Sequence, residues 1–478
     1  MASVRDPWPA PRAAGPVDAV LGVPGSKSVT NRALVLAALA DGPSTISGPL
    51  RARDTLLMAG ALRALGVRIA DDGTDWHVEP GRLRGPAAVD VGLAGTVLRF
   101  VPPVAVLADG PVDFDGDPRS RERPVGQLLA ALRVLGAAVN DAGRGALPFT
   151  VRGSGALPGG TATIDASASS QLVSGLLLAA PRFDQGLTLR HAGSRVPSGL
   201  HIEMTVRMLR DAGAEVDAVS ERDRREWTVK PGGLTACDVA VAPDLSTAAP
   251  FAAAALVTGG RVRVLGWPRR AYQPGDLLPD LLTSMGATCA LDDSGLTVTG
   301  GASIEGIDVD LGDASELAPV LAAVAALART PSTLRGIGHT RTHETDRLAA
   351  LATELGRLGG DVTETADGLR IVPRPLRGGV FRTYHDHRLA MAAAVLGLAV
   401  DGVGIENVAT TGKTVPDFPA RWLAMLGRPG TAPDRAPAPD DAGRGTGTPD
   451  SHAGAGTAPD RAPAPDDAGR GTGTGPGR

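Results

Sequence analysis

The sequence predicts an α/β protein built from six tandem copies of one helix-then-strand unit. Two observations lead to this fold class. A helix that ends in an apolar residue and a glycine, and mostly runs on into a strand, recurs six times along the chain. A second, more apolar helix precedes each of these helices, and a short amphipathic strand follows it.

The recurring junction is recognised by its glycine, because glycine just past a helix end accepts the left-handed backbone conformation at little cost. The junctions lie in segments 58–69, 128–139, 204–216, 278–289, 351–362 and 418–427. Their glycines are Gly66, Gly136, Gly213, Gly286, Gly359 and Gly427. Successive glycines are 68 to 77 residues apart, which chance does not produce.

The second helix of each unit is apolar on nearly all sides. Such helices are expected at 31–40, 171–180, 251–257, 319–327 and 389–400. A unit of two helices and several short strands cannot bury its own apolar face. We therefore expect the units to pack together, with the apolar helices inside and the strands and more polar helices outside.

Charge and hydropathy exclude several classes of partner. The formal net charge is −4, whereas binding to a nucleic-acid backbone needs a basic face. No apolar run reaches the roughly 18 residues of a membrane span, and the stretch 1–16 is proline-rich rather than apolar. We expect a cytoplasmic protein with small-molecule partners, no nucleic acid and no membrane.

Two further features of composition carry no chemistry. A stretch at 430–448 recurs at 456–474 and is rich in Ala, Pro, Gly and Asp, which predicts a disordered tail over 428–478. Cys237 and Cys289 lack the paired spacing of a metal site or a disulfide framework. Both cysteines are expected to be buried and without function.

Lysine is rare in this chain. Of 48 basic residues only Lys27, Lys230 and Lys413 are lysine, and the others are arginine. An ammonium group can lose its proton in a suitable site, whereas a guanidinium group cannot. Lys27 and Lys413 lie in polar motifs and are therefore candidates for function, whereas Lys230 lies at a strand end that we expect to be exposed.

Polar motifs interrupt the apolar pattern mostly where a strand meets the start of a helix. Backbone N–H groups and the positive end of the helix dipole converge there, so such junctions favour anions. The motifs lie at 24–32, 92–99, 117–124, 167–171, 340–348, 384–388 and 411–418. Ser198 and His201 stand at the corresponding point one strand after the fourth motif.

Several motifs also allow other interpretations. Lys27-Ser28 is like a nucleotide-binding P-loop, but that loop needs a glycine directly before the lysine, and a serine precedes Lys27. The segment 117–124 alone could be a solvated charged loop, and the acidic residues of 340–348 could simply favour a helix N-terminus. His385 and His387 form a His-x-His pair, but no further ligands complete a metal shell. No metal site is expected.

In this order, PGSKSVTNRA, GLAGTVLRF, DPRSRERP, SASSQ, HETDRL, DHRLAM and GKTVPDF resemble the motifs of the EPSP synthase (3-phosphoshikimate 1-carboxyvinyltransferase) family, from about residue 17 to 427. The resemblance implies a two-domain inside-out α/β barrel of six βαβαββ-like units, three per domain. One domain would comprise 1–25 and 244–427, and the other 26–243.

The resemblance also implies an activity. Members transfer the enolpyruvyl group of phosphoenolpyruvate to the 5-hydroxyl of shikimate 3-phosphate and release phosphate, on the pathway to chorismate and aromatic amino acids. No cofactor is implied, and we expect a monomer. Glu316 would accept the hydroxyl proton, and Lys27 would protonate the substrate methylene, with Glu344 as a partner. A lysine whose pKa is depressed by other cations suits such work.

Substrate contacts follow by the same resemblance. Shikimate 3-phosphate would be bound by Lys27, Ser28, Arg32, Ser169, Ser170, Ser198, Glu316 and His343. Phosphoenolpyruvate would be bound by Lys27, Gly95, Arg123, Gln171, Arg347, Arg388 and Lys413. Arginine forks suit the carboxylate and phosphate groups of that substrate.

The sequence departs from the commonest form of this family at several positions. Glu316 stands where many members have aspartate, and His343 where many have lysine, which would make its substrate contact pH-dependent. Leu93 and Phe100 replace a frequent asparagine and proline, and both are expected in the loop beside phosphoenolpyruvate. Gly95 has no side chain to intrude on that pocket, so we expect inhibition by glyphosate.

Two other functions are compatible with the same repeat. The sister enzyme UDP-N-acetylglucosamine enolpyruvyl transferase shares the repeat but normally carries a loop cysteine, whereas Arg123 occupies that loop here. A non-catalytic binding protein could use the same scaffold, since fold does not fix function. The presence of Lys27, Glu316 and Arg123 argues against this second rival.

Overall fold

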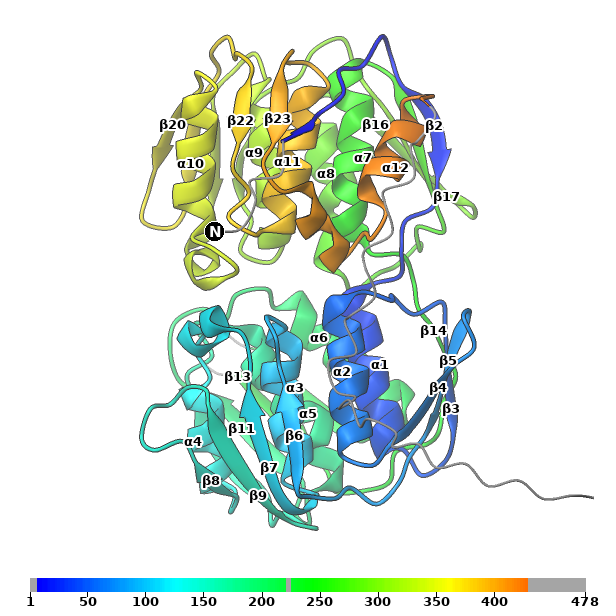
Figure 1. The fold of residues 1–478 in the computed structure, drawn as a ribbon, viewed down its shortest axis with the longest axis vertical. Coiled ribbons are helices and arrows are strands. Elements are labelled where there is room, and N and C mark those ends of the chain that lie inside the picture. Colours follow the sequence, from blue (N-terminus) through cyan, green and yellow to red (C-terminus); the bar gives the residue numbers. More distant parts are fainter. Residues whose placement is uncertain (1–6, 221–224, 429–478) are drawn as a thin grey trace, which may run out of the picture. The chain divides into compact units, whose positions relative to one another are not determined.

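The structure is a computed structural model that describes residues 7–220 and 225–428. Within these residues the strands form six sheets, five with four strands and one with three (Figure 1). Apart from residue 428, the tail expected at 428–478 lies outside the described residues.

The third unit shows how a repeat is built. It runs β10 (Gly160–Ile164), α5 (Ser170–Ala179), β11 (Leu187–His191), α6 (Leu200–Asp211), β12 (Val216–Ser220) and β13 (Arg225–Val229). β10 and β11 are parallel because α5 crosses between them, whereas β13 lies antiparallel between β11 and β12. This βαβαββ order confirms the predicted α/β fold class.

The second and fifth units have the same strand order. The second consists of β6 (Ala87–Asp90), α3 (Gly95–Ala105), β7 (Asp109–Asp115), α4 (Gly126–Val134), β8 (Ala138–Asn140) and β9 (Phe149–Ser154). The fifth consists of β18 (Asp308–Asp310), α9 (Ala318–Ala326), β19 (Ser332–Arg335), α10 (Arg347–Arg357), β20 (Asp361–Glu364) and β21 (Leu369–Val372). In both, the first two strands are parallel and the later pairs antiparallel.

The first and fourth units exchange their first strands. The first unit holds α1 (Lys27–Leu39), β3 (Ser44–Ser47), α2 (Arg53–Ala64), β4 (Arg68–Asp71) and β5 (Asp75–Glu79). The fourth holds α7 (Leu245–Thr258), β15 (Arg261–Leu265), α8 (Leu278–Ser284), β16 (Thr288–Asp292) and β17 (Gly295–Thr299). β2 (Asp18–Leu21) precedes α1 but pairs with β15, and β14 (Val239–Ala240) precedes α7 but pairs with β3. Gly25 and Pro243 form an isolated bridge where the chain crosses.

The sixth unit is completed by the N-terminal part of the chain. It contains β22 (Gly379–Phe381), α11 (His387–Gly397), β23 (Val403–Ile405) and α12 (Phe418–Met425). No strand pair follows α12 within the described residues, and β1 (Trp8–Pro9) pairs antiparallel with β23 instead. The last unit therefore depends on residues that lie some four hundred positions earlier in the sequence.

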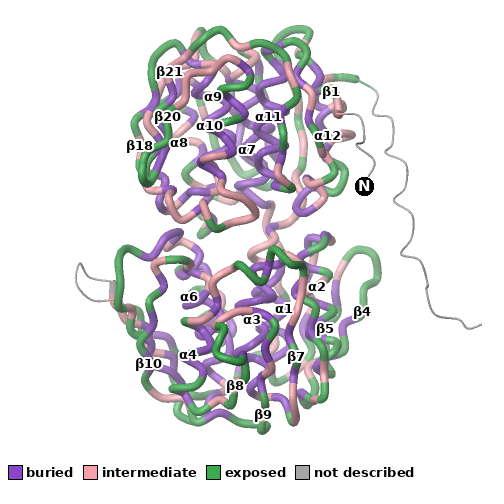
Figure 2. The backbone as a smooth tube through the Cα atoms, turned by 60° about the vertical axis from the view of Figure 1, so that its left-hand side comes forward, coloured by how far each residue is buried: buried purple, intermediate pink, exposed green. Residues whose placement is uncertain are grey.

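The apolar helices lie inside, as the sequence predicts. Every residue of α3, α9 and α11 is buried. The buried apolar side chains fall into two clusters, one from residues 33 to 234 and one from residues 10, 17 and 245 to 425. Figure 2 shows the buried inner helices surrounded by strands with exposed positions. We propose that residues 1–25 and 244–427 form one domain and residues 26–243 the other.

The outer helices are amphipathic. In α10, Leu348, Leu351 and Leu355 are buried at helical spacing, whereas Thr353 and Arg357 are exposed. None of the helices in the described residues is long and apolar enough to cross a membrane.

All six predicted capping glycines have a positive φ, between 68° and 105°. They are Gly66, Gly136, Gly213, Gly286, Gly359 and Gly427. A side chain is disfavoured in this backbone region because its Cβ meets the neighbouring carbonyl. The sequence interpretation of these junctions is therefore confirmed.

Gly66→Ala is expected to lower the free energy of unfolding by about 1–2 kcal/mol, because Gly66 has φ 101° and its Cβ would lie 3.2 Å from the carbonyl of Arg82. Gly60→Ala in the same α2 helix is the matched control. Gly60 is exposed with open space around its Cβ position, so alanine should leave stability unchanged or increase it. Urea unfolding measures both, and equal effects of the two changes would contradict the capping role.

Candidate active site

A small cavity of about 60 Å³ lies where helix starts from both hydrophobic clusters meet. Its lining consists of Lys27, Asp54, Gly95, Thr96, Arg99, Arg123, Ala168, Ser169, Gln171, Glu316, Thr342, His343, Glu344, Arg347, His387, Arg388 and Lys413. Of the residues assigned from the sequence, the cavity brings together Lys27, Gly95, Arg123, Ser169, Gln171, Glu316, His343, Glu344, Arg347, Arg388 and Lys413.

Helix N-termini supply much of this lining. Lys27, Gly95, Arg347 and His387 are the first residues of α1, α3, α10 and α11, and Gln171 is the second residue of α5. The first turn of a helix has unpaired N–H groups and the positive end of the helix dipole. The convergence of several such turns makes the cavity attractive to anions.

Side-chain charge strengthens this preference. The cavity is lined by six cationic side chains, Lys27, Arg99, Arg123, Arg347, Arg388 and Lys413, but by only three carboxylates, Asp54, Glu316 and Glu344. Like charges that face one another across a cavity with little water repel strongly. An anionic ligand would relieve this repulsion.

The two cavity lysines share one buried carboxylate. The Nζ atoms of Lys27 and Lys413 each lie 3.7 Å from Oδ2 of Asp54, whose side chain is 2% exposed. Lys413 also forms a close ion pair with Glu344. Asp54 lies on α2 of the first unit and Lys413 at the end of the turn η6 (Val408–Lys413), so Asp54 joins residues from the two clusters.

Two arginines are held in defined orientations. Nε of Arg347 donates to Oδ2 of Asp386 at 2.7 Å, and its Nη2 donates to Glu344 at 3.1 Å. Nη2 of Arg388 donates to Oε2 of Glu316 at 3.2 Å. Such charge-assisted bonds fix the planar guanidinium groups more firmly than neutral ones would.

Burial and neighbouring charges shift the pKa values of Lys27, Glu316 and Glu344. Burial, and next the charge of Lys413, lower the pKa of Lys27 below its ordinary value. Burial would raise the pKa of Glu316, but Arg388 and His201 outweigh it and hold that pKa well below the usual range. Lys413 and Arg347 do the same for Glu344. Both glutamates are therefore carboxylates at neutral pH, whereas Lys27 can give up its proton more readily than an ordinary lysine.

Arg99, Arg123 and Gln171 surround Gly95. Nη1 of Arg99 donates to Oε1 of Gln171 at 3.2 Å, so the Gln171 amide N–H groups are left to donate elsewhere. Nη1 of Arg123 donates to the carbonyl of Leu93 at 3.0 Å. A Cβ at Gly95 would lie 2.8 Å from Arg99 and 3.0 Å from Arg123, so only glycine leaves both forks undisturbed.

His343 is neutral in this setting. Burial, and next Arg347, lower its pKa well below the usual range. Nη1 of Arg347 lies 3.2 Å from Nδ1 of His343, and since a guanidinium only donates, Nδ1 accepts and Nε2 carries the proton. Protonation at Nδ1 would break this contact, so any pH dependence of His343 lies in the acid range.

Four assigned residues do not line the cavity: Ser28, Arg32, Ser170 and Ser198. Arg32 is 1% exposed, and its guanidinium donates to Thr205, Ser174 and the carbonyls of Ser28 and His201. Ser198 lies beside Ser315, with 3.5 Å between their Oγ atoms, and links the two clusters through its N–H bond to Gly312.

Several details of the sequence interpretation are wrong. Phe100 lies not in the loop but fully buried in α3, where the guanidinium of Arg32 stacks over its ring. By contrast, Glu344 and Asp346 lie just before α10 and Asp346 caps it, as the interpretation of these acidic residues as a helix N-terminus allowed. Cys237 and Cys289 are half-buried rather than buried. Lys230 is exposed as expected and pairs with Glu215.

Three ionisable lining residues escaped assignment from sequence, Asp54, Arg99 and His387, as did Thr96, Ala168 and Thr342. Arg99 and His387 stand inside motifs that were singled out, so their position next to Gly95 and Arg388 was the available signal. Asp54 has no such signal, because it lies outside every polar motif and its partner Lys413 lies far away in the chain. No group of metal ligands occurs among the described residues, and His385 is exposed while His387 is buried.

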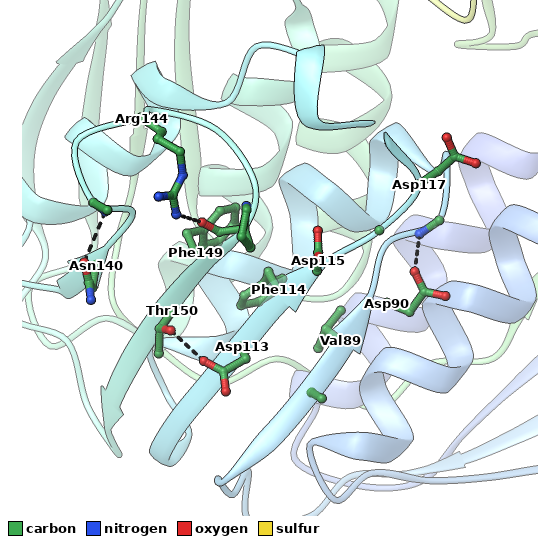
Figure 3. Close-up of a pocket in the computed structure, with 15 residues that line it drawn as sticks. Val89, Asp90, Asp113, Phe114, Asp115, Asp117, Asn140, Arg144, Phe149 and Thr150 are labelled. Carbon is green, nitrogen blue, oxygen red and sulfur yellow. Dashed lines mark hydrogen bonds between the residues drawn. The ribbon is translucent and has the colours of Figure 1, made fainter. Parts of the chain in front are cut away.

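A larger hollow of about 800 Å³ lies on the second sheet, away from these residues (Figure 3). Its floor includes the stacked rings of Phe114 and Phe149. Its charged lining is mostly acidic, with Asp90, Asp113, Asp115 and Asp117 against the single cation Arg144. None of the assigned catalytic or substrate-binding residues lines it, and its charge disfavours anions.

His339→Asn is expected to make stability less sensitive to acid. Burial, and next Arg347, lower the pKa of His339 to about 4, whereas an unfolded histidine titrates near 6.5. Between these values the unfolded state binds more protons, so the free energy of unfolding falls as the pH drops from about 6.5 to 4. Asparagine can keep the 2.9 Å contact with Ser315 but cannot titrate, so Tm should fall less steeply with decreasing pH.

The matched control is His77→Asn, because the His77 side chain is 49% exposed on β5. This control should follow the wild-type slope. If Tm falls equally steeply with decreasing pH in wild type and in His339→Asn, His339 does not contribute to the loss of stability in acid.

Comparisons with known proteins agree with this geometry. Residues 11–422 match the family model described as EPSP synthase (3-phosphoshikimate 1-carboxyvinyltransferase). A curated 3-phosphoshikimate 1-carboxyvinyltransferase from Kocuria rhizophila is 54% identical over 437 residues, which are 89% of this chain and 98% of that protein.

Solved structures give the same result. An EPSP synthase from Acinetobacter baumannii is similar with a TM-score of 0.74 and 26% identity, over 89% of this chain and 98% of the other. The enolpyruvyl transferase NikO from Streptomyces tendae is similar in fold, with a TM-score of 0.70 and 20% identity, over 88% and 98% of the two chains. With its sixfold repeat and its cation-lined cavity, the chain belongs to the EPSP synthase family.

Proposed function

We propose that this protein transfers the enolpyruvyl group of phosphoenolpyruvate to the 5-hydroxyl of shikimate 3-phosphate and releases phosphate. The family match and the 54% identical relative support this reaction. The observation that carries it is the surplus of cations in a cavity that also holds Lys27 and Glu316. Both substrates are phosphorylated anions, and one also carries a carboxylate.

The ion pairs of the cavity suit an exchange with substrate. Glu344 pairs with Lys413 and Arg347, and Glu316 pairs with Arg388. The phosphate groups of the substrates are stronger partners for these cations than a glutamate, because they carry up to two negative charges. Once the cations contact substrate, the glutamates lose their positive neighbours, and their pKa values rise toward those of useful bases.

Glu316 and Lys27 then have complementary tasks. Glu316 accepts the proton of the 5-hydroxyl as its oxygen attacks C2 of phosphoenolpyruvate, and Lys27 donates a proton to the C3 methylene. The resulting tetrahedral intermediate collapses when a C3 proton returns to a base and the phosphate leaves. Glu344, held beside Lys413 and Arg347, is placed to take part in that second proton transfer.

The cations stabilise the phosphate as negative charge develops on it. We assign phosphoenolpyruvate to Lys27, Gly95, Arg123, Gln171, Arg347, Arg388 and Lys413. We assign shikimate 3-phosphate to Lys27, Ser28, Arg32, Ser169, Ser170, Ser198, Glu316 and His343. Ser169 and His343 line the cavity, whereas Arg32 supports this side through its bonds to Ser174 and Thr205.

The remaining expectations belong to the same proposal. We propose a monomer in the cytoplasm that needs no metal or organic cofactor. No observation favours the rival UDP-N-acetylglucosamine reaction, and neither Cys237 nor Cys289 lines the cavity.

Phosphate release with both substrates tests the function. Glu316→Gln and Lys27→Met are each expected to lower kcat by about 10²–10⁴, because each removes one proton-transfer group. Lys230→Met is the matched control, since Lys230 is exposed and outside the cavity, and it should keep wild-type kcat and KM. A wild-type protein that releases no phosphate, or a Lys27→Met variant that keeps full activity, would refute the proposal.

Gly95→Ala is expected to raise KM for phosphoenolpyruvate about tenfold and to weaken inhibition by glyphosate. The new methyl group would displace the forks of Arg99 and Arg123, which lie 2.8 and 3.0 Å from its position. Gly412→Ala, beside Lys413 but with open space around its Cβ position, is the matched control. Inhibition constants and KM values from the same assay decide this, and a Gly95→Ala variant with unchanged values would contradict the assignment.

A further inference from the structure

The turn between β22 and α11 contains two successive non-glycine residues with left-handed backbone. Tyr384 has φ 50° and His385 has φ 60°. Among the described residues only Ala142 and Ser198 share this property without being glycine. Because side chains disfavour this region, neighbouring contacts must hold the turn in place.

Glu354 provides those contacts from the outer helix α10. Its side chain has no exposed surface. Oε2 accepts the N–H of Arg382 at 3.0 Å, and Oε1 accepts the hydroxyl of Tyr384 at 2.6 Å. A carboxylate buried away from water is costly unless donors surround it. The carboxylate and the turn therefore fix one another.

The hydroxyl of Tyr384 stays a donor at neutral pH. Burial, and next the carboxylate of Glu354, raise the pKa of Tyr384 to about 12. The Tyr384 hydroxyl consequently keeps its proton throughout the pH range in which an enzyme assay is run.

The same turn ends in the cavity. Asp386 caps α11 by accepting the N–H of Arg388 at 2.8 Å, and it accepts Nε of Arg347 at 2.7 Å. Arg347 precedes Glu354 by seven residues, which places both on the same side of α10, about two turns apart. Helix α10 and the turn are thus joined at two points, one inside the cavity and one outside it.

We infer that Glu354 is a positioning residue for phosphoenolpyruvate, acting through the Tyr384 turn on Arg388 and Arg347. Glu354 is absent from the cavity lining, so it acts through other residues. The inference rests on the proposed function, which assigns both arginines to that substrate. A shift of the start of α11 moves the Arg388 guanidinium, and displacements of about 1 Å already weaken such arrangements markedly.

Steady-state kinetics of Glu354→Gln and Tyr384→Phe test the inference. Glutamine keeps the shape but turns one acceptor into a donor, and phenylalanine removes only the hydroxyl. Both variants should raise KM for phosphoenolpyruvate, by about tenfold for Glu354→Gln. KM for shikimate 3-phosphate should rise less, because Glu316 and His343 are affected only through Arg388 and Arg347. Tyr384→Phe is the milder change and serves if Glu354→Gln folds poorly.

Rescue separates positioning from general stability. His385 is exposed and has a left-handed backbone. Glycine at this position adopts that backbone conformation without needing the contacts of Glu354 to stabilise it. The double variant Glu354→Gln/His385→Gly should therefore recover part of the lost affinity for phosphoenolpyruvate. Glu406→Gln, the same chemical change at an exposed position of the same cluster of units, is the matched control and should behave as wild type.

The outcomes are distinguishable. An active wild type whose Glu354→Gln and Tyr384→Phe variants keep both KM values, even with a lower Tm, would overturn the inference and leave the proposed function intact. A KM increase of equal size for both substrates, without rescue by His385→Gly, would also overturn it. A wild type that releases no phosphate would overturn the proposed function, and the inference with it.

Discussion

The surplus of positive charge in one buried cavity is the constraint on which the rest of this structure depends. Cations that repel one another cannot be held together in a protein interior unless carboxylates are placed among them. Asp54, Glu316, Glu344 and, behind Arg347, Asp386 fill this role. Asp54 and Asp386 are almost completely buried. The free-energy cost of burying each carboxylate is offset because each contacts two or more hydrogen-bond donors or cations.

The inside-out arrangement follows from the same constraint. Helix starts from several units can point at one place only if those helices pack together, and then the strands must cover them from outside. Apolar residues on all sides of α3, α9 and α11 make that packing favourable. The polar residues of these helices lie toward their starts, as Thr96 and Arg99 do in α3 and His387 and Arg388 in α11.

A structural feature could be predicted from the sequence where the residues that cause it are close neighbours in the chain. The capping glycines and the apolar helices were predictable, since a glycine past a helix end and an all-apolar face act within one turn. Lys27, Gly95, Arg347 and Arg388 lie in polar motifs that the sequence singled out, and the resemblance of those motifs to a known family assigned their roles. Asp54 could not be found, because its partner Lys413 comes from the sixth unit and Lys27 from a different helix of its own unit. Nor could Phe100 be placed, because only the packed structure shows Arg32 over its ring.

The strand exchange has a consequence for the order in which the chain folds. During synthesis, residues 33–234 with their strand β14 emerge as one continuous stretch, so the first cluster can complete its sheets by itself. β1 and β2 are made before the first cluster, whereas their partners β23 and β15 are made after it. β1 and β2 therefore cannot pair until the first cluster has been synthesised. Pairing across such long separations is slow because the closing loop is large. β1 and β2 are thus expected to pair last, although they precede the first cluster in the sequence.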